Sequence, residues 1–101
     1  MIVVTDNPDA DRYEAHLDGT LAGILEYTEK RSRIALVHTE VARAFGGRGI
    51  AAELARFALA DARRRGLRVI VLCPYVRAYL ERHPEDRDVV VSPTHVDDPT
   101  E

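Results

Sequence analysis

The chain has little of the chemistry that defines several common protein classes. It contains one cysteine, Cys73, one methionine and no tryptophan. A lone cysteine excludes an internal disulfide and a zinc site built mainly from thiolates, and it fits a reducing compartment. No apolar run approaches the roughly 18 residues that a transmembrane helix needs. The N-terminal segment also lacks the basic region and long apolar stretch of a secretion signal. We therefore expect a cytoplasmic protein without a membrane anchor.

The histidines give no metal signature. His16, His83 and His95 are far apart and lack the spacing to cysteines or carboxylates that metal sites show, so we expect no metal. The length of 101 residues predicts one domain. We place that domain in residues 1–91 and expect the polar, proline-containing residues 92–101 to form a loose tail.

Charge is distributed unevenly along the chain, although the net charge is only −3. Residues 43–68 carry seven arginines against two carboxylates, whereas residues 81–101 carry seven carboxylates against two arginines. A basic region around residues 43–68 favours a polyanionic ligand. The alternative is that Arg63, Arg64 and Arg65 form a solvated helix end that complements the helix dipole. We favour that role for these three and take Arg48 as the better ligand candidate.

The most informative stretch is the glycine-rich segment from Phe45 to Ala51, which holds three glycines in four positions. Glycine allows a tight turn with positive φ and leaves room for a close backbone approach. A strand-like run precedes this turn and a helix-like run follows it. The free amides at the start of the helix and the positive end of its dipole then point into the turn. This combination predicts a site for a phosphate or pyrophosphate group.

Hydrophobic periodicity predicts an α/β (α+β) fold with a mainly antiparallel sheet. Residues 12–17 alternate as a half-buried strand does, and Asp18-Gly19 is a strong hairpin signal. In the return strand Leu21, Gly23, Leu25 and Tyr27 are expected on one face, with a bulge or close backbone approach at Ala22-Gly23. The predicted elements are strands 2–5, 12–17, 21–28, 33–41, 69–72 and 88–91 and helices 50–65 and 75–82. Gly66 is the predicted stop of the long helix.

The helix between strands 33–41 and 69–72 predicts a crossover connection. Parallel strands need such a connection, so these two strands are expected to run parallel. The sheet would otherwise be an antiparallel meander, closed by a short C-terminal helix.

Four motifs in order give the chain a family resemblance: HTEV at 38–41 with the preceding Val37, GRGIA at 47–51, LCPY at 72–75, and a downstream His83-Pro84. The chain resembles the small Gcn5-related N-acetyltransferase-like proteins, a minimal, YjdJ-type branch of the GNAT superfamily. This resemblance implies a minimal GNAT-like fold, acetyl-CoA as cosubstrate and an amine as acceptor. It also implies an open acceptor site, because the chain has no room for two helices that larger relatives carry between their first strands.

The resemblance also implies positions for the coenzyme. The acyl-CoA turn of the superfamily, Arg/Gln-x-x-Gly-x-Gly/Ala, falls on residues 46–51. Gly49 and Ala51 match this pattern, whereas Gly46 stands where Arg or Gln is usual. Val41 and Glu40 lie at the end of the strand that pairs with the pantetheine arm in similar proteins. The implied coenzyme-binding residues are Val41, Gly46, Gly47, Arg48, Gly49, Ile50 and Ala51.

Four residues are candidates for the chemistry of acetyl transfer, which needs a neutral amine and a proton for the leaving thiolate. Glu40 and His38 are candidate general bases, placed on one face of a strand by their two-residue spacing. Each has a plain alternative, an ion pair with an arginine for Glu40 and a hydrogen bond to a neighbour for His38. Tyr79 is a candidate general acid or a packed aromatic residue. Cys73 is a candidate acetyl carrier or a small buried apolar residue.

The sequence therefore predicts an N-acetyltransferase with an unidentified amine acceptor. A protein that binds acyl-CoA without useful catalysis is one alternative. A KH-like nucleic-acid module is the other, because residues 46–49 also fit a GxxG loop. The KH reading is weaker, since such a loop joins two helices and the net charge here is negative.

Overall fold

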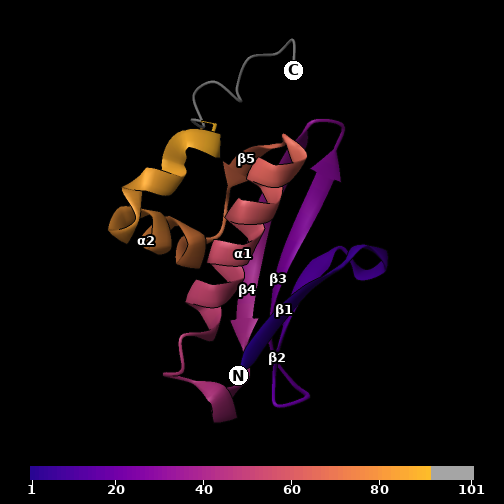
Figure 1. Ribbon diagram of the computed structural model, residues 1–101, viewed down its shortest axis with the longest axis vertical. Coiled ribbons are helices and arrows are strands. Elements are labelled where there is room, and N and C mark those ends of the chain that lie inside the picture. Colours follow the sequence, from indigo (N-terminus) through magenta and orange to yellow (C-terminus); the bar gives the residue numbers. More distant parts are fainter. Residues whose placement is uncertain (92–101) are drawn as a thin grey trace.

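The computed structural model describes residues 1–91 and shows a five-stranded sheet with helices packed on one face (Figure 1). The strands lie in the order β1-β2-β3-β4-β5. All neighbouring strands pair antiparallel except β4 and β5, which run parallel as the crossover predicted. The elements are β1 (Ile2–Asn7), η1 (Pro8–Ala10), β2 (Arg12–Leu17), β3 (Thr20–Lys30), β4 (Arg33–Val41), η2 (Arg43–Phe45), α1 (Ile50–Arg65), β5 (Arg68–Val71), α2 (Pro74–Arg82) and η3 (Pro84–Val89).

The core lies between the sheet and α1. Apolar residues at helical spacing on α1 pack against alternate residues of the central strands, so one face of the sheet is buried. Members of this core with no exposed surface include Tyr13, Ala15, Leu25, Ile34, Leu36, Leu54 and Leu59. The side chains on the opposite face, including Arg12, Glu14 and Ile24, are half-buried or exposed. That second face is the one on which polar chemistry has access to solvent.

Two β-bulges change which residues face the core. In β3, Ala22 is an extra residue, because Ala15 pairs with Gly23 while His16 pairs with Leu21. The expectation that Leu21 shares the face of Gly23 is therefore wrong, and Leu21 is 42% exposed. In β4, Val37 is the extra residue opposite the step from Glu26 to Tyr27. Burial in β4 consequently passes from Ile34 and Leu36 to Thr39.

Gly23 brings the start of α1 close to the sheet. A Cβ at this position would lie 2.8 Å from Cγ2 of Ile50 and 2.9 Å from the carbonyl oxygen of Glu40. These separations are too short for a side chain, so only glycine fits without displacing the helix or the strand. The predicted close approach at Ala22-Gly23 is thus confirmed, and it locates the first turn of α1 against the end of β4.

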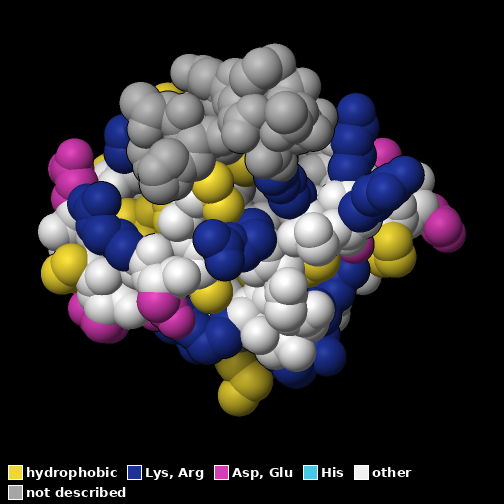
Figure 2. Space-filling model, turned by 90° about the horizontal axis from the view of Figure 1, so that it is seen from above, with side chains coloured by type: hydrophobic (Ala, Val, Ile, Leu, Met, Phe, Trp, Pro, Cys, Tyr) yellow, Lys and Arg dark blue, Asp and Glu magenta, His cyan; other side chains and the backbone are white. Residues whose placement is uncertain are grey.

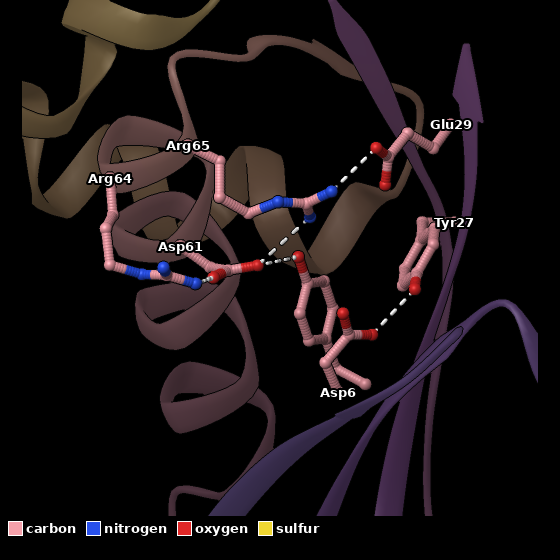
Figure 3. A network of polar contacts seen from close by, with 7 residues as sticks. Asp6, Tyr27, Glu29, Asp61, Arg64 and Arg65 are labelled. Carbon is pink, nitrogen blue, oxygen red and sulfur yellow. Dashed lines mark hydrogen bonds and ion pairs between the residues drawn. The ribbon is translucent and has the colours of Figure 1, made fainter. Parts of the chain in front are cut away.

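A polar network fixes the other end of α1 to the sheet (Figure 3). Asp61 is 7% exposed, accepts a hydrogen bond from the Tyr13 hydroxyl at 2.9 Å and pairs with Arg64 and Arg65. Arg65 also reaches Glu29 on β3 at 2.6 Å. Burial and the Asp61 hydrogen bond raise the pKa of Tyr13, which keeps this hydroxyl protonated as a donor. No local sequence pattern indicates this network, because its central contact joins residues 48 positions apart.

The last predicted strand is wrong. Residues 84–89 form the 3-10 helix η3 instead, and only Val90 bridges to Val69 of β5. Pro84 lacks an amide hydrogen and favours the first turn of a helix, which fits this outcome. The predicted tail at 92–101 lies outside the described residues.

Candidate functional site

The glycine turn leads directly into α1. Gly47 and Gly49 have φ values of 79° and 75°, so both occupy the left-handed region that favours glycine. Gly49 is the N-cap of α1 and provides no side-chain cap. Gly46 is different, because its φ of −63° and ψ of 147° suit any residue. The backbone therefore favours glycine at positions 47 and 49. At position 46 the backbone conformation would accept any residue, and glycine simply leaves the side chain out.

The amides of this turn are available to a ligand. Hydrogen bonds within the turn use the amides of Phe45 and Gly46. In the first turn of α1 the Glu53 amide bonds to the Gly49 carbonyl at 3.0 Å. Within residues 1–91 no intramolecular backbone hydrogen bond uses the amides of Gly47, Arg48 or Gly49. The first turn of a helix also leaves its own amides without intrahelical partners. The turn thus combines unpaired donors with the positive end of the α1 dipole, an arrangement suited to an anion.

Arg48 is the cation nearest in sequence to these amides. Its guanidinium carbon lies 5.9 Å from the centre of the Phe45 ring, and the side chain is otherwise exposed. Stacking on an aromatic face leaves the outer edge of a guanidinium open to an anion.

The second half of the site is the edge of β4. Pairing with β5 covers residues 33–36 only and ends with the Leu72 amide bonded to the Leu36 carbonyl at 2.9 Å. The chain then turns through Cys73 into α2, so β4 and β5 part at this point. In the described chain no strand pairs with residues 37–41 on the side of β5, although β3 pairs with them on the other side. An extended ligand can add to such an edge through main-chain hydrogen bonds.

A groove of about 580 Å³ lies beside this edge. It is lined by Arg12, Leu21, Ala22, Gly23, Ile24, His38, Thr39, Glu40, Val41, Ala42 and Tyr75. Of the predicted site residues it includes His38, Glu40 and Val41. Arg12, Ile24 and Tyr75 were not predicted as site residues, because they come from three separate elements. Tyr75 directly follows Cys73-Pro74 in the recognised motif at 72–75, so that motif could have indicated it.

His38 and Glu40 lie together as their spacing predicted. Nε2 of His38 is 3.2 Å from Oε2 of Glu40, and both side chains are at least half exposed. A carboxylate and an imidazole in contact at a groove can accept a proton from a ligand and pass it to solvent.

Cys73 and Tyr79 are buried and have partners. Cys73 is fully buried, with its Sγ 3.1 Å from Oγ1 of Thr39. Tyr79 is 5% exposed, donates to Asp86 at 3.4 Å and stacks on His83 with ring centres 4.3 Å apart. Burial and the Asp86 carboxylate raise the pKa of Tyr79, so the hydroxyl keeps its proton. Neither side chain lines the groove.

The basic cluster of the sequence is divided in space. Arg63, Arg64 and Arg65 lie at the last turn of α1, about 20 Å along the helix from the glycine turn. Figure 2 views the molecule from that end and shows basic side chains spread over it. The three arginines pair with carboxylates. Arg63, for example, pairs with Asp86 and Asp88. The three arginines therefore lie at the helix end, as the alternative stated, but they pair with carboxylates rather than being simply solvated.

Two structural features are not found among the described residues. Residues 1–91 hold no group of three or more histidine, cysteine or carboxylate side chains able to bind a metal. Within the same range, every helix is too short or too polar to span a bilayer.

Known proteins resemble this chain in sequence and in fold. Residues 12–89 match the family described as GCN5-related N-acetyl-transferase. The chain is 41% identical over 61 residues to protein NATD1 of Bos taurus and 39% identical over 61 residues to protein NATD1 of Homo sapiens. Each alignment covers 60% of this chain and 53% of the relative, so the chain matches about half the length of these proteins. The solution structure of a GCN5-like protein from Staphylococcus aureus superposes with a TM-score of 0.67 at 19% identity. That superposition covers 96% of this chain and 95% of the other and shows the same fold.

Proposed function

Since the chain belongs to the GCN5-related N-acetyltransferase family, we propose that it binds acetyl-CoA and transfers the acetyl group to a primary amine. One observation carries this proposal. The unpaired amides of the glycine turn and the unpaired edge of β4 adjoin each other, because a short connection through η2 links the end of β4 to the start of α1.

The turn holds the diphosphate in this proposal. The amides of Gly47, Arg48 and Gly49, followed by those of Ile50 and Ala51, donate to phosphate oxygens at the positive end of α1. A Cβ at Gly47 or Gly49 would meet no atom within 4 Å, so the space above the turn is open to a ligand. Gly46 provides no side chain, and Arg48 supplies the positive charge.

The edge of β4 holds the pantetheine arm. The amide groups of the pantetheine arm resemble those of a peptide backbone. Main-chain groups of residues 37–41 that do not pair with β3 can therefore form hydrogen bonds with them. Val41 is half-buried at the end of the strand and packs against the core. This pairing directs the thioester toward the groove lined by His38 and Glu40.

The groove receives the amine. When bound, acetyl-CoA supplies an activated acetyl group as a thioester. Glu40, with His38 in contact at 3.2 Å, attracts the ammonium form, accepts its proton and leaves a neutral amine. Both side chains reach solvent, which takes the proton away. Cys73 and Tyr79 stay outside this proton path in our proposal, because each is buried with a partner.

The KH-like alternative lacks the required frame. The glycine turn follows β4 and the short η2, whereas a KH loop joins two helices. The other alternative is a protein that binds acyl-CoA without catalysis, and experiment has to distinguish it from an acetyltransferase.

Calorimetric titration with acetyl-CoA, followed by a coupled assay for released CoA over a panel of amines, tests the proposal. We expect binding that free CoA competes for, and turnover of at least one amine. Glu40→Gln is expected to lower kcat roughly tenfold to a hundredfold and to leave acetyl-CoA affinity within twofold. Arg82→Gln, on the exposed end of α2, is the control and should change neither quantity. Absence of acetyl-CoA binding would overturn the proposal. Binding of acetyl-CoA without turnover of any amine would overturn the acetyltransferase activity and support a protein that only binds acyl-CoA.

A further inference from the structure

The groove beside β4 carries charges of opposite sign on two of its walls. Arg12 on β2 and Glu40 on β4 both line it, and Ile24 on the intervening strand β3 lies between them. Most of the other lining residues are apolar, Leu21, Val41 and Tyr75 among them. Small-molecule sites commonly combine an apolar lining with a few placed polar groups.

Strand register places the two charges on either side of Ile24. Glu14 pairs with Ile24, and Ile24 pairs with Glu40, so these three residues form one row across the sheet. Arg12 donates from Nε to Glu14 at 2.9 Å, which brings its guanidinium to that row. With neighbouring strands about 4.8 Å apart, the backbones of β2 and β4 are about 10 Å apart. This separation leaves room for a molecule of amino-acid size above Ile24.

The guanidinium of Arg12 is held in place and still has donors to offer. Glu14 is 15% exposed and also accepts a hydrogen bond from Nδ2 of Asn7 at 2.9 Å. Hydrogen bonds from Asn7 and Arg12 lower the pKa of Glu14, so it stays charged and keeps its hold on Arg12. Within residues 1–91 the side-chain hydrogen bond of Arg12 uses Nε. Its two terminal amino groups can therefore form a fork for a second carboxylate.

On the premise of the proposed function, we propose that the acceptor is a small apolar amine that also carries a carboxylate, such as an apolar amino acid. Its ammonium group lies at Glu40 and His38, its carboxylate lies at Arg12, and its apolar body covers Ile24 and contacts Tyr75. The ammonium loses one proton through Glu40 to solvent, and the neutral nitrogen forms a bond to the acetyl carbon as the carbon–sulfur bond breaks. The second proton of that nitrogen goes to the departing thiolate, which gives free CoA and the N-acetylated product.

The same groove disfavours the other amine classes. A polyamine has several ammonium groups and needs several carboxylates, but Glu40 is the one carboxylate among the described lining residues. A lysine side chain within a protein offers no carboxylate for Arg12. A polyamine would place a second positive charge beside the Arg12 guanidinium, and a lysine-containing protein would place an uncharged peptide there. Neither would provide a carboxylate for the free amino groups of Arg12.

Turnover of matched acceptors tests this inference on the full chain. Leucine and phenylalanine would be compared with leucinamide and phenylalaninamide, which keep the amine and apolar body but lack the carboxylate. Spermidine and a lysine-containing peptide would represent the competing classes. Rates are compared per neutral amine, because the amides have more acidic ammonium groups. We expect the carboxylate-bearing amines to have the highest kcat/KM.

Arg12→Gln then isolates the guanidinium. We expect the ratio of kcat/KM for leucine to that for leucinamide to fall roughly tenfold to a hundredfold, through KM, and Arg12→Lys to restore part of it. Comparing one ratio between variants cancels the intrinsic reactivity of each amine. Arg82→Gln is the matched control and should leave the ratio unchanged. NMR titration of the wild type with leucine is expected to shift the signals of Ile24 and His38, which keeps the test independent of variant folding.

The outcomes separate the two proposals. If acetyl-CoA does not bind in calorimetry, the proposed function fails. If acetyl-CoA binds but spermidine, the peptide or the amides exceed the amino acids, or no carboxylate-bearing amine is acetylated, the acceptor inference alone fails. An unchanged ratio in Arg12→Gln would also overturn it.

Discussion

The two ends of α1 are built in opposite ways. At its C-terminal end, Gly66 caps the helix, and the Leu67 amide bonds to the Ala62 carbonyl at 2.8 Å. The buried Asp61 there joins Tyr13, Arg64 and Arg65 in a partly buried network. At its N-terminal end, Gly49 gives no side-chain cap, and the turn before it leaves amides unpaired within residues 1–91. One end satisfies its polar groups internally, whereas the other leaves them for a ligand.

This difference separates stability from binding along a single helix. A glycine N-cap makes a helix less stable than a serine, threonine or aspartate cap does, by roughly a few tenths of a kcal/mol. The anchored end offsets that cost, because its ion pairs and hydrogen bonds join α1 to β2 and β3. Changes at the two ends should therefore have different consequences, and the following experiments test that separation.

The largest effect is expected from Gly49→Glu. It places negative charge and bulk at the amides proposed to bind diphosphate, and we expect acetyl-CoA affinity to fall more than a hundredfold in calorimetry. Gly66→Glu is the matched control, since Gly66 has a similar φ of 72° at the other end of α1. Both variants should lose about 1 kcal/mol or more of unfolding free energy from strain. Equal losses of affinity in the two would remove the distinction between the ends.

Asp61→Ala should give the next largest effect, and on stability alone. The buried Tyr13 hydroxyl loses its acceptor, and we expect unfolding free energy to fall by about 2 kcal/mol in urea denaturation. Acetyl-CoA affinity at a temperature where the variant is folded should stay within twofold. A large loss of affinity would show that the two ends are coupled.

A pH series separates the charge of Asp61 from its shape. Burial raises the pKa of Asp61, but hydrogen bonds from Arg64, Tyr13 and Arg65 outweigh it and leave the pKa below its ordinary value. A carboxyl group with a lowered pKa in the folded state adds stability that is complete above its unfolded pKa of about 3.9 and is lost as pH falls through the folded pKa. The stability difference between the wild type and Asp61→Asn should be constant from pH 7 to 5 and shrink below about pH 4. A difference independent of pH would show that charge contributes nothing.

The smallest effect is expected from Arg63→Ala. Its ion pairs with Asp86 and Asp88 join the last turn of α1 to η3, but Arg63 is 41% exposed and Asp88 57%. Solvent screens such pairs, so we expect a loss of about 0.5 kcal/mol that disappears at high salt. A salt-independent loss above about 1 kcal/mol would place this contact within the anchored end described for Asp61.

Long, regular patterns made the fold predictable from the sequence. Strand β4 and helix α1 begin and end at the predicted residues, because their periodicity extends over nine and sixteen residues with glycine following the helix. The bulge at Val37 left no such signal, since valine suits any strand position. Asp61 resembled an ordinary surface residue of a helix, because its partner Tyr13 comes from a strand 48 residues earlier.

The site was predictable only where it is local in sequence. The glycine turn and the pair His38 and Glu40 follow from adjacent residues, and the contact of that pair at 3.2 Å confirms the predicted shared face. The groove draws residues from β2, β3, β4 and α2, so its lining depends on register and strand separation that no single segment encodes. The roles assigned to all these residues remain predictions.

The missing side chain at Gly23 has a consequence for molecular length. In the proposed complex acetyl-CoA is held at its diphosphate by α1 and along its pantetheine arm by β4, and a covalent molecule cannot stretch to suit a different distance between these two contacts. A Cβ at residue 23 would lie 2.8 Å from Cγ2 of Ile50 on α1 and 2.9 Å from the Glu40 carbonyl oxygen on β4, so any larger residue would displace the helix or the strand. The absence of a side chain at residue 23 thus sets the distance between the proposed diphosphate site at α1 and the edge of β4.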